Sequence, residues 1–220
     1  MQTNTKISAK QRVYEIIKYN IINCRYLPNS YLSESMLTSE LDTSRTPIRE
    51  ALTKLEQEGW ISIHPQRGMS VSDLSINEIA MVYETRLLIE PYVAEKYGHA
   101  IDKTCLAELS RRLGTINGNI NKEEANEIDN EFHTLITKFS KNRYFIRSME
   151  NLIHQSHRIR TMISTRWDDD TAEHIAIASA ILDEDYMKAA SYLQTHLENA
   201  KKHAYNLLIQ NGGWITPHET

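Results

Sequence analysis

The sequence predicts a mainly α-helical protein, with an N-terminal winged helix-turn-helix followed by an all-α antiparallel helical bundle. The 220 residues include only seven Gly and five Pro, which disfavours loop-rich all-β folds and favours helices. Apolar residues recur three and four positions apart through most of the chain, as amphipathic helices require. The alternation of apolar and polar residues that is typical of strands occurs around residues 61–72.

Two helices are expected before residue 42. The first is predicted from Ser8 to about Asn23, where apolar residues follow helical spacing, and Pro28 breaks the pattern after it. Ser33 is suited to cap the N-terminus of a second, short helix that ends near Leu41. A tight turn of three residues follows.

The third helix has recognisable ends. Ser44 or Thr46 can cap its N-terminus, and Pro47 falls in the first turn, where a missing N–H costs little. Gly59 stands where a C-cap is expected. Two helices joined by a turn of three or four residues form a helix-turn-helix.

A β-hairpin is expected directly after the third helix. Ile61–His64 and Met69–Ser72 each alternate apolar and polar residues, and Pro65–Gly68 can turn between them. A hairpin in this place makes the motif a winged helix, so the first domain is predicted to span residues 8–73.

Residues 77–212 are expected to form a second, all-helical domain. Breaks in the periodicity occur near Gly98, near Gly114 and Gly118, and at Trp167–Asp170. A helical bundle is the simplest way to bury the apolar stripes between these breaks. The predicted helices are 77–98, 102–118, 121–140, 142–165, 171–181 and 184–210.

Composition indicates a cytoplasmic protein that does not enter a membrane. No stretch approaches the roughly 18 apolar residues that a membrane span needs, and no apolar segment follows the N-terminal charge as in a secretory signal. Cys24 and Cys105 are too few for a disulfide framework and are expected to be reduced thiols.

Charge alone does not indicate a nucleic-acid ligand. Residues 1–75 contain nine Lys/Arg and eight Asp/Glu, a balance of +1, and the remaining residues contain 16 against 21, a balance of −5. The N-terminal third is less acidic than the rest, but it is not a strongly basic domain.

The third helix offers residues suited to DNA. Arg45 and Arg49 are four positions apart and share a helix face. An arginine there can donate two parallel hydrogen bonds to guanine O6 and N7 in the major groove. Ser44 and Thr46 can contact phosphate, and Arg67 in the wing can reach the backbone or the minor groove. The alternative is a solvated basic face, but the winged-helix context favours DNA.

Several runs of residues in this region resemble the winged-helix domain of the GntR family of bacterial transcription regulators. The most specific is Ser-Arg-Thr-Pro-Ile-Arg-Glu-Ala-Leu, and the resemblance extends over about residues 8–73. It implies that five residues face DNA: Arg45, Thr46, Arg49, Arg67 and Gly68. The family commonly has Arg after the glutamate of its second helix, where this chain has Ser35. That departure puts one phosphate or base contact in doubt.

Asp129 and His133 form a second group of candidate functional residues. They are four positions apart and so project from one helix face about one turn from each other, close enough for one metal ion to bridge them. A carboxylate with an imidazole suits Zn, Ni, Mn or Fe. Because the chain contains nine histidines, such a pair is weak evidence by itself.

Residues 77–210 as a whole resemble the all-helical effector domain of the FadR subgroup of GntR regulators, the FCD domain. The marks of that domain are Tyr83–Glu90, an Asp-x-x-x-His motif, Asn142–Phe145, Glu173-His174 and a later histidine. In that family an aspartate and three histidines hold one divalent ion inside the bundle. The resemblance therefore implies a Zn, Ni or Mn site made of Asp129, His133, His174 and His196.

An anionic effector needs a cationic partner in addition to the ion, because guanidinium and carboxylate form bidentate pairs. The candidates for this partner are Arg86, Arg158 and Arg160, and Arg86 and Arg158 are the predicted effector-binding residues.

The function predicted from these observations is that of a one-component transcription regulator, expected to act as a repressor. A homodimer would place two recognition helices on a palindromic double-stranded DNA operator, and a small carboxylate at the metal site would modulate binding. One alternative is a regulator that senses the metal itself. Another is a metallo-hydrolase on a helical bundle, which is disfavoured because no residue is placed as an obvious general base.

Overall fold

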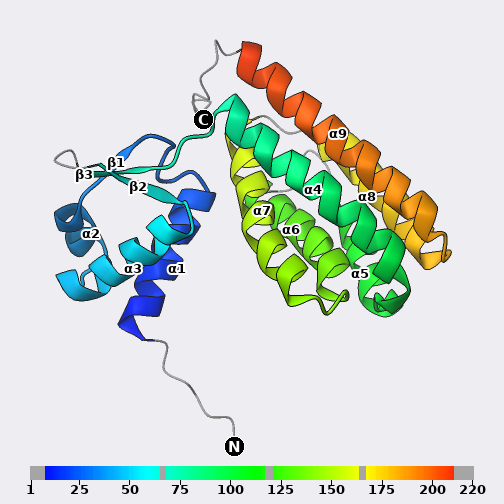
Figure 1. Cartoon of the computed structure of the whole chain (residues 1–220), viewed down its shortest axis with the longest axis horizontal. Coiled ribbons are helices and arrows are strands. Elements are labelled where there is room, and N and C mark those ends of the chain that lie inside the picture. The colour runs from blue at the N-terminus through cyan, green and yellow to red at the C-terminus, as the bar shows by residue number, and fades with distance from the viewer. Residues whose placement is uncertain (1–7, 65–67, 117–120, 164–166, 211–220) are drawn as a thin grey trace, which may run out of the picture. The chain divides into compact units, whose positions relative to one another are not determined.

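The computed structural model describes residues 8–64, 68–116, 121–163 and 167–210. These residues fall into two compact units that divide after Leu74 (Figure 1). The first unit contains α1 (Ala9–Ile22), β1 (Tyr31–Leu32), α2 (Glu34–Glu40), α3 (Arg45–Gln57), β2 (Ile61–His64) and β3 (Gly68–Val71). The second contains α4 (Ile76–Tyr97), the short 3₁₀ helix η1 (Gly98–Ala100), α5 (Lys103–Leu113), α6 (Lys122–Lys138), α7 (Arg143–Met162), α8 (Trp167–Leu182) and α9 (Tyr186–Gln210).

The first unit is the predicted winged helix-turn-helix, with one additional strand. The sheet has the order β1-β3-β2, and β3 pairs antiparallel with both neighbours. Sequence reasoning expected a two-stranded hairpin, because β1 is only two residues long and shows no alternation of its own. The expected second strand, Met69–Ser72, lies one residue earlier, at Gly68–Val71.

The helix ends in this unit follow from local chemistry. The hydroxyl groups of Ser8 and Ser33 accept hydrogen bonds from the backbone N–H groups three residues later, each at 3.2 Å. Ser44 occupies the N-cap position of α3, but its side chain makes no capping hydrogen bond. Gly59 follows the last turn of α3 with φ +79°, the left-handed conformation in which glycine ends helices without strain.

The core of the first unit lies where α1 and α3 pack on each other and on the sheet. Ile17 and Ile21 of α1 are fully buried, as are Ile48 and Leu55 of α3 and Trp60 beyond it. Burying the apolar face of α3 leaves its opposite face exposed.

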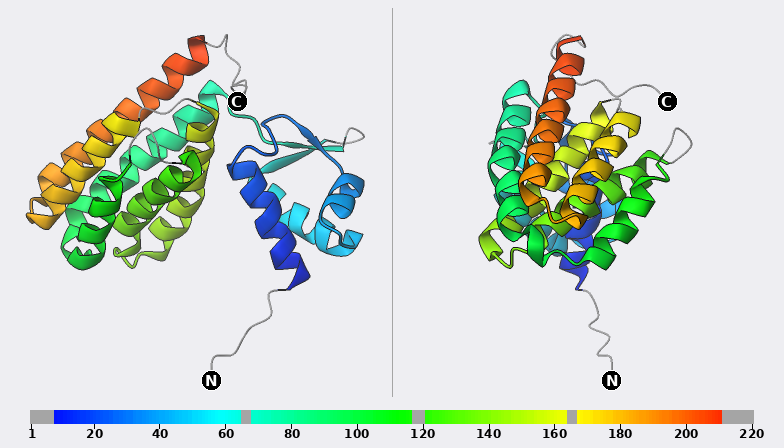
Figure 2. Two further views of the ribbon diagram at one scale, coloured as in Figure 1. Left: turned by 180° about the vertical axis from the view of Figure 1, so that it is seen from behind. Right: turned by 90° about the vertical axis from the view of Figure 1, so that its right-hand side faces the viewer.

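The second unit is an all-helical bundle, as predicted. The helix α4 runs along α9 over much of its length, and α8 packs on α9, an arrangement visible in both views of the bundle (Figure 2). Phe132 and Ile136 of α6 and Val93 of α4 are fully buried in the bundle core. None of the helices in the described ranges is long and apolar enough to cross a membrane.

Three predicted helix boundaries in the bundle were wrong, one of them the end of α7, which lies at Met162 and not at residue 165. The helix α5 ends at Leu113, not at residue 118, because the chain turns at Gly114 and Thr115, where the Thr115 hydroxyl donates to the Arg112 carbonyl oxygen. The helix α8 begins at Trp167, where a break had been expected. Acidic residues are favoured in the first turn of a helix by its dipole, so the run Asp168–Asp170 suits a helix start.

Candidate metal centre and nucleic-acid interface

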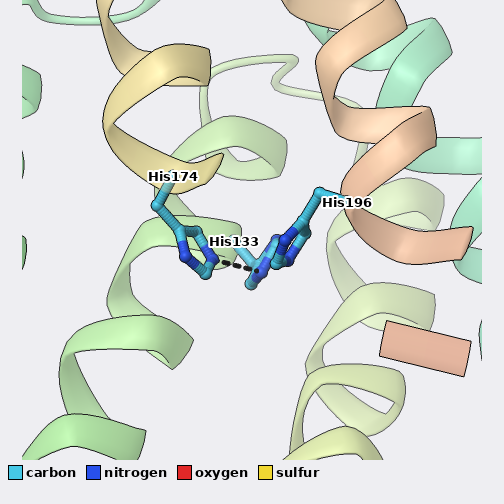
Figure 3. Close-up of side chains that lie close together, drawn as sticks. All are labelled: His133, His174 and His196. Atoms are coloured by element: carbon cyan, nitrogen blue, oxygen red, sulfur yellow. Dashed lines mark hydrogen bonds between the residues drawn. The ribbon is translucent and has the colours of Figure 1, made fainter. Parts of the chain in front are cut away.

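Three histidines from three helices meet inside the bundle. His133 lies on α6, His174 on α8 and His196 on α9, and all three are buried. One ring nitrogen of each lies within 4.8 Å of a ring nitrogen of the other two. Figure 3 shows the three rings pointing toward one another, with the Nε2 atoms of His133 and His174 3.2 Å apart. The bundle therefore brings together histidines that are up to 63 positions apart in the sequence.

The other ring nitrogen of each histidine is held by an oxygen. The Nδ1 atom of His133 lies 2.5 Å from Glu90 Oε2, that of His174 lies 2.6 Å from the Asp170 carbonyl oxygen, and that of His196 lies 2.7 Å from Glu173 Oε2. An oxygen acceptor beside Nδ1 holds the proton on that atom, so each Nε2 presents a lone pair. Partners of this kind orient histidines that ligate metals.

The three histidines fit a divalent cation. Burial lowers the pKa of His174 to about 3, with the neighbouring His196 acting in the same direction, and burial also lowers the pKa of His133 well below its usual value. The rings of His133 and His174 are therefore neutral at pH 7, and their two Nε2 lone pairs repel each other without a cation between them. Nitrogen ligands about 2.1 Å from a tetrahedral ion lie about 3.4 Å apart, close to the separation of 3.2 Å between the Nε2 atoms of His133 and His174.

Asp129 stands beside the histidines as a fourth ligand candidate. Its Oδ1 atom lies 3.4 Å from His174 Nε2 and 3.9 Å from His133 Nε2. Its Oδ2 atom lies 2.6 Å from Nη2 of Arg160. Burial alone would raise the pKa of Asp129, but Arg160 and the other positive neighbours outweigh it and hold the pKa far below its ordinary value. The carboxyl group is thus ionised, with one oxygen directed at the imidazoles.

A small cavity of about 20 Å³ adjoins these residues. Its lining includes Asp129, His196, Arg86 and Arg160. A volume of about 10–15 Å³ on this measure holds one water molecule. A ligand with several heavy atoms can therefore enter only if side chains in the lining move.

Arg86 is fully buried and has one nitrogen to offer to a ligand. Its Nε atom donates to Glu90 Oε1 at 2.5 Å, and Nη1 donates to the Ser156 hydroxyl at 2.8 Å. Within the described residues, Nη2 is buried without a hydrogen-bond partner. A buried donor without a partner is costly, so an anion in the cavity would stabilise the site.

Arg158 was expected near this cavity, but the structure does not place it in the lining. Arg158 is fully buried in α7 but is not among the described residues that line the cavity. Arg160, two positions later, occupies the lining and the ion pair with Asp129. Helical phase alone did not distinguish the two arginines, because both are buried on a helix with neighbours on several sides.

Sequence reasoning also missed the residues that orient the ligands. Glu90 joins Arg86 to His133, since one carboxylate oxygen accepts from each. Glu173 holds His196. Glu90 is fully buried, and the charged pair Arg86 and Glu90, four positions apart among the apolar residues of α4, is the signal that could have found it.

The candidate DNA-binding residues lie at the N-terminal end of α3. Ser44, Arg45, Thr46 and Arg49 are all exposed. Arg49 Nε donates to both carboxylate oxygens of Glu34 on α2, at 2.8 and 2.9 Å.

The wing contributes one described residue to this set. Gly68 is exposed and has φ +87°, a conformation that side chains rarely adopt. The predicted contact Arg67 lies outside the described residues.

Two family models match the chain. The model described as "Bacterial regulatory proteins, gntR family" matches residues 9–71, and the FCD domain matches residues 81–199. The two matches fall on the first and the second compact unit, respectively.

Curated relatives and solved structures resemble the chain over most of its length. The HTH-type transcriptional repressor RspR of Escherichia coli K12 is 26% identical over 98% of this chain and 97% of its own. The gluconate operon transcriptional repressor of Bacillus subtilis is 30% identical over 67% of this chain and 62% of its own.

Two solved structures share the fold. The crystal structure of a proposed transcriptional regulator GntR from Rhodococcus sp. RHA1 has a TM-score of 0.79 at 19% identity, over 90% of this chain and 97% of that one. The Zn²⁺-bound FCD domain of TM0439 has a TM-score of 0.56 at 21% identity, over 63% of this chain and 99% of that one.

Proposed function

Because the chain belongs to the GntR family of bacterial regulatory proteins and has an FCD domain, it is a transcriptional regulator and not an enzyme, and we propose that a small carboxylate at a metal site in its bundle modulates its binding to DNA. The single observation that supports this proposal best is the convergence of three buried imidazoles whose Nδ1 atoms are all held by oxygens. Relatives named as repressors favour repression as the mode of action.

His133, His174, His196 and Asp129 would hold the ion. Zn²⁺ is the first candidate, since a solved FCD domain of this fold binds it and the ligand set of nitrogen and oxygen atoms suits it; Ni²⁺ and Mn²⁺ are the alternatives. When bound, the ion would supply positive charge that attracts the carboxylate of the effector.

Arg86 Nη2 is the second contact that we propose for the effector. Arg86 is held at Nε and Nη1 and lines the cavity, so its remaining nitrogen is the one left to contact a ligand there. Arg160 already contacts Asp129, Asn126 and Asn130, so we propose that it orients Asp129 and does not contact the effector. We retain Arg158 only as a buried neighbour, without a contact to the effector.

The size of the cavity gives the effector a way to act. A ligand larger than the present volume is bound only by a conformation in which the lining has opened, so it has different affinities for the two conformations. Differential affinity is the physical requirement for shifting a population, and tight binding to both states would shift nothing.

DNA binding is assigned to the exposed end of α3 and to the wing. We propose that Arg45 and Arg49 read bases in the major groove and that Ser44 and Thr46 contact phosphates. In the wing, we propose that Arg67 and Gly68 approach the DNA backbone or the minor groove. A homodimer would bind a palindromic operator, because operator symmetry follows the two-fold symmetry of the protein. No helix able to span a membrane occurs in the described chain, and we propose a cytoplasmic location.

A thermal-shift screen tests the effector site. Protein stripped with a chelator and protein loaded with Zn²⁺ are each mixed with a panel of small carboxylic acids, since a ligand of the folded state raises the unfolding temperature. We expect one class of acids to give a shift that requires the metal and that Arg86→Met abolishes. The control Arg147→Met removes an exposed arginine of the same unit and should leave the shift unchanged.

The screen also separates the alternatives. Metal stabilisation without a shift from any acid would contradict the carboxylate proposal and favour a regulator that senses the metal itself. Loss of DNA binding in the double variant Arg45→Ala plus Arg49→Ala, but not in the double variant Arg143→Ala plus Arg147→Ala of α7, is the result expected for the DNA assignment.

A further inference from the structure

An ion pair joins the first turn of α2 to the recognition helix. Both carboxylate oxygens of Glu34 accept from Nε of Arg49, at 2.8 and 2.9 Å. The side chain of Arg49 remains 64% exposed and that of Glu34 31% exposed, so the pair lies at the surface with the arginine outermost. Glu34 therefore contacts only the Nε atom of Arg49, and most of the Arg49 side chain is exposed to solvent.

The contact leaves the two terminal nitrogens of Arg49 available. Among the described residues, neither Nη1 nor Nη2 of Arg49 makes a hydrogen bond, and Arg45 one turn earlier makes no ion pair. A bidentate contact to guanine O6 and N7 needs two coplanar donors in a fixed orientation. The structure thus contains one arginine that is oriented before DNA arrives and one that is not.

The position of Glu34 is itself well defined. It is the first residue of α2, where a negative charge is favoured by the helix dipole. The hydroxyl of Ser33 caps this turn by accepting from Met36 N at 3.2 Å, and Ser35 Oγ lies 3.1 Å from Ser33 Oγ. The next residue of α2, Ser35, is uncharged, so it does not compete with Arg49 for the Glu34 carboxylate.

We propose that Glu34 is a positioning residue for base readout: it orients Arg49 through Nε and so sets the base preference at the position that Arg49 reads. This inference rests on the proposed DNA-binding role of α3. An arginine that is already ordered loses less side-chain freedom on binding a base. The negative charge of Glu34 also disfavours phosphates, so it lowers binding to random sequence more than binding to the preferred one.

Selection from a library of randomised DNA duplexes tests the proposal without knowledge of the operator. Bound pools are sequenced for the wild type, Glu34→Gln, Glu34→Ala and Arg49→Ala, and binding to one fixed random duplex is measured in parallel. The glutamine variant removes the charge but keeps an oxygen that accepts from Nε, whereas alanine removes both. Glu56→Gln, an exposed glutamate at the other end of α3, is the matched control for charge.

We expect base discrimination at one position of the selected sequence to fall in the order wild type, Gln, Ala, with a loss of about tenfold for alanine. Affinity for random duplex should rise equally in the Gln and Ala variants. Discrimination that is unchanged in Glu34→Ala but lost in Arg49→Ala would overturn the positioning role and leave the DNA assignment intact. Discrimination unchanged in Arg49→Ala would refute the assignment itself.

A purely structural role of Glu34 predicts a different result. Weakening of every duplex by the same factor in Glu34→Ala, together with a lower unfolding temperature, would also overturn the proposal.

Discussion

Replacement of Arg160 by methionine is the most informative perturbation of the bundle. Its Nη2 atom lies 2.6 Å from Asp129 Oδ2 and donates to Asn130 Oδ1 at 2.9 Å, while Nε donates to Asn126 Oδ1 at 3.0 Å. Asp129 and Arg160 are 4% and 8% exposed. The variant keeps the apolar part of the side chain and removes the cation.

The expected destabilisation follows from the charge that is left behind. Removing one partner of a buried ion pair typically costs about 3–5 kcal/mol, because the other charge remains buried without compensation. The two amide oxygens of Asn126 and Asn130 lose their donor as well, which acts in the same direction. We therefore expect Arg160→Met to lower the free energy of unfolding by about 4 kcal/mol in the presence of a chelator.

Urea unfolding of the full chain, followed by circular dichroism, measures this effect. The double variant Arg160→Met plus Asp129→Asn should recover about 2 kcal/mol, since the buried charge has gone. The matched control Arg111→Met removes an exposed arginine that pairs with Glu108 on the surface, and it should leave the unfolding midpoint unchanged. A loss below about 1 kcal/mol in Arg160→Met would refute the view that Arg160 compensates Asp129.

Three further predictions concern pH, packing and metal. Burial, together with Arg160, lowers the pKa of His157 to about 3. Between pH 3 and 6.5 the unfolded chain therefore binds a proton at His157 that the folded chain does not bind. The free energy of unfolding should fall as the pH falls through this window. His157→Gln should reduce the slope of unfolding free energy against pH by about 1.4 kcal/mol per unit, and an unchanged slope would contradict a neutral buried imidazole. Gly98→Ala should lower stability by about 1–3 kcal/mol in urea unfolding, because the new Cβ would lie 2.5 Å from Tyr186 Cδ1; wild-type stability would show that the ring moves freely. Zn²⁺ at 100 times its Kd should stabilise chelator-stripped protein by about 2.7 kcal/mol in the same assay, and His174→Gln should lose most of this gain.

The fold was largely predictable because its signals are local. The helical spacing of apolar residues, the N-cap serines Ser8 and Ser33 and the glycine after α3 are all visible in short windows of sequence. The strand β1 was missed because its pairing partners lie 37 and 39 residues later, and two residues carry no periodicity of their own. The start of α8 was misplaced because Asp-rich runs suit both loops and first turns of helices.

The candidate site was predictable only in part. Asp129 and His133 share a helix face, and spacing alone suggested that pair; His174 and His196 came from the family resemblance. Glu90 and Arg160 were not predicted as partners of the ligands, because their roles depend on which helices meet and on how far each side chain reaches. No pattern within a single helix contains that information.

The coupling between the effector site and DNA is tested most directly by fluorescence anisotropy of a duplex taken from the randomised-library selection. The Kd of the full chain for this duplex is measured with and without Zn²⁺ and with and without the acid identified by thermal shift. The proposed function predicts that the acid changes the Kd by about 5-fold or more only when the metal is present, and that Arg86→Met removes the change. A Kd that is the same in all four conditions, for a protein that binds both metal and acid, would contradict it.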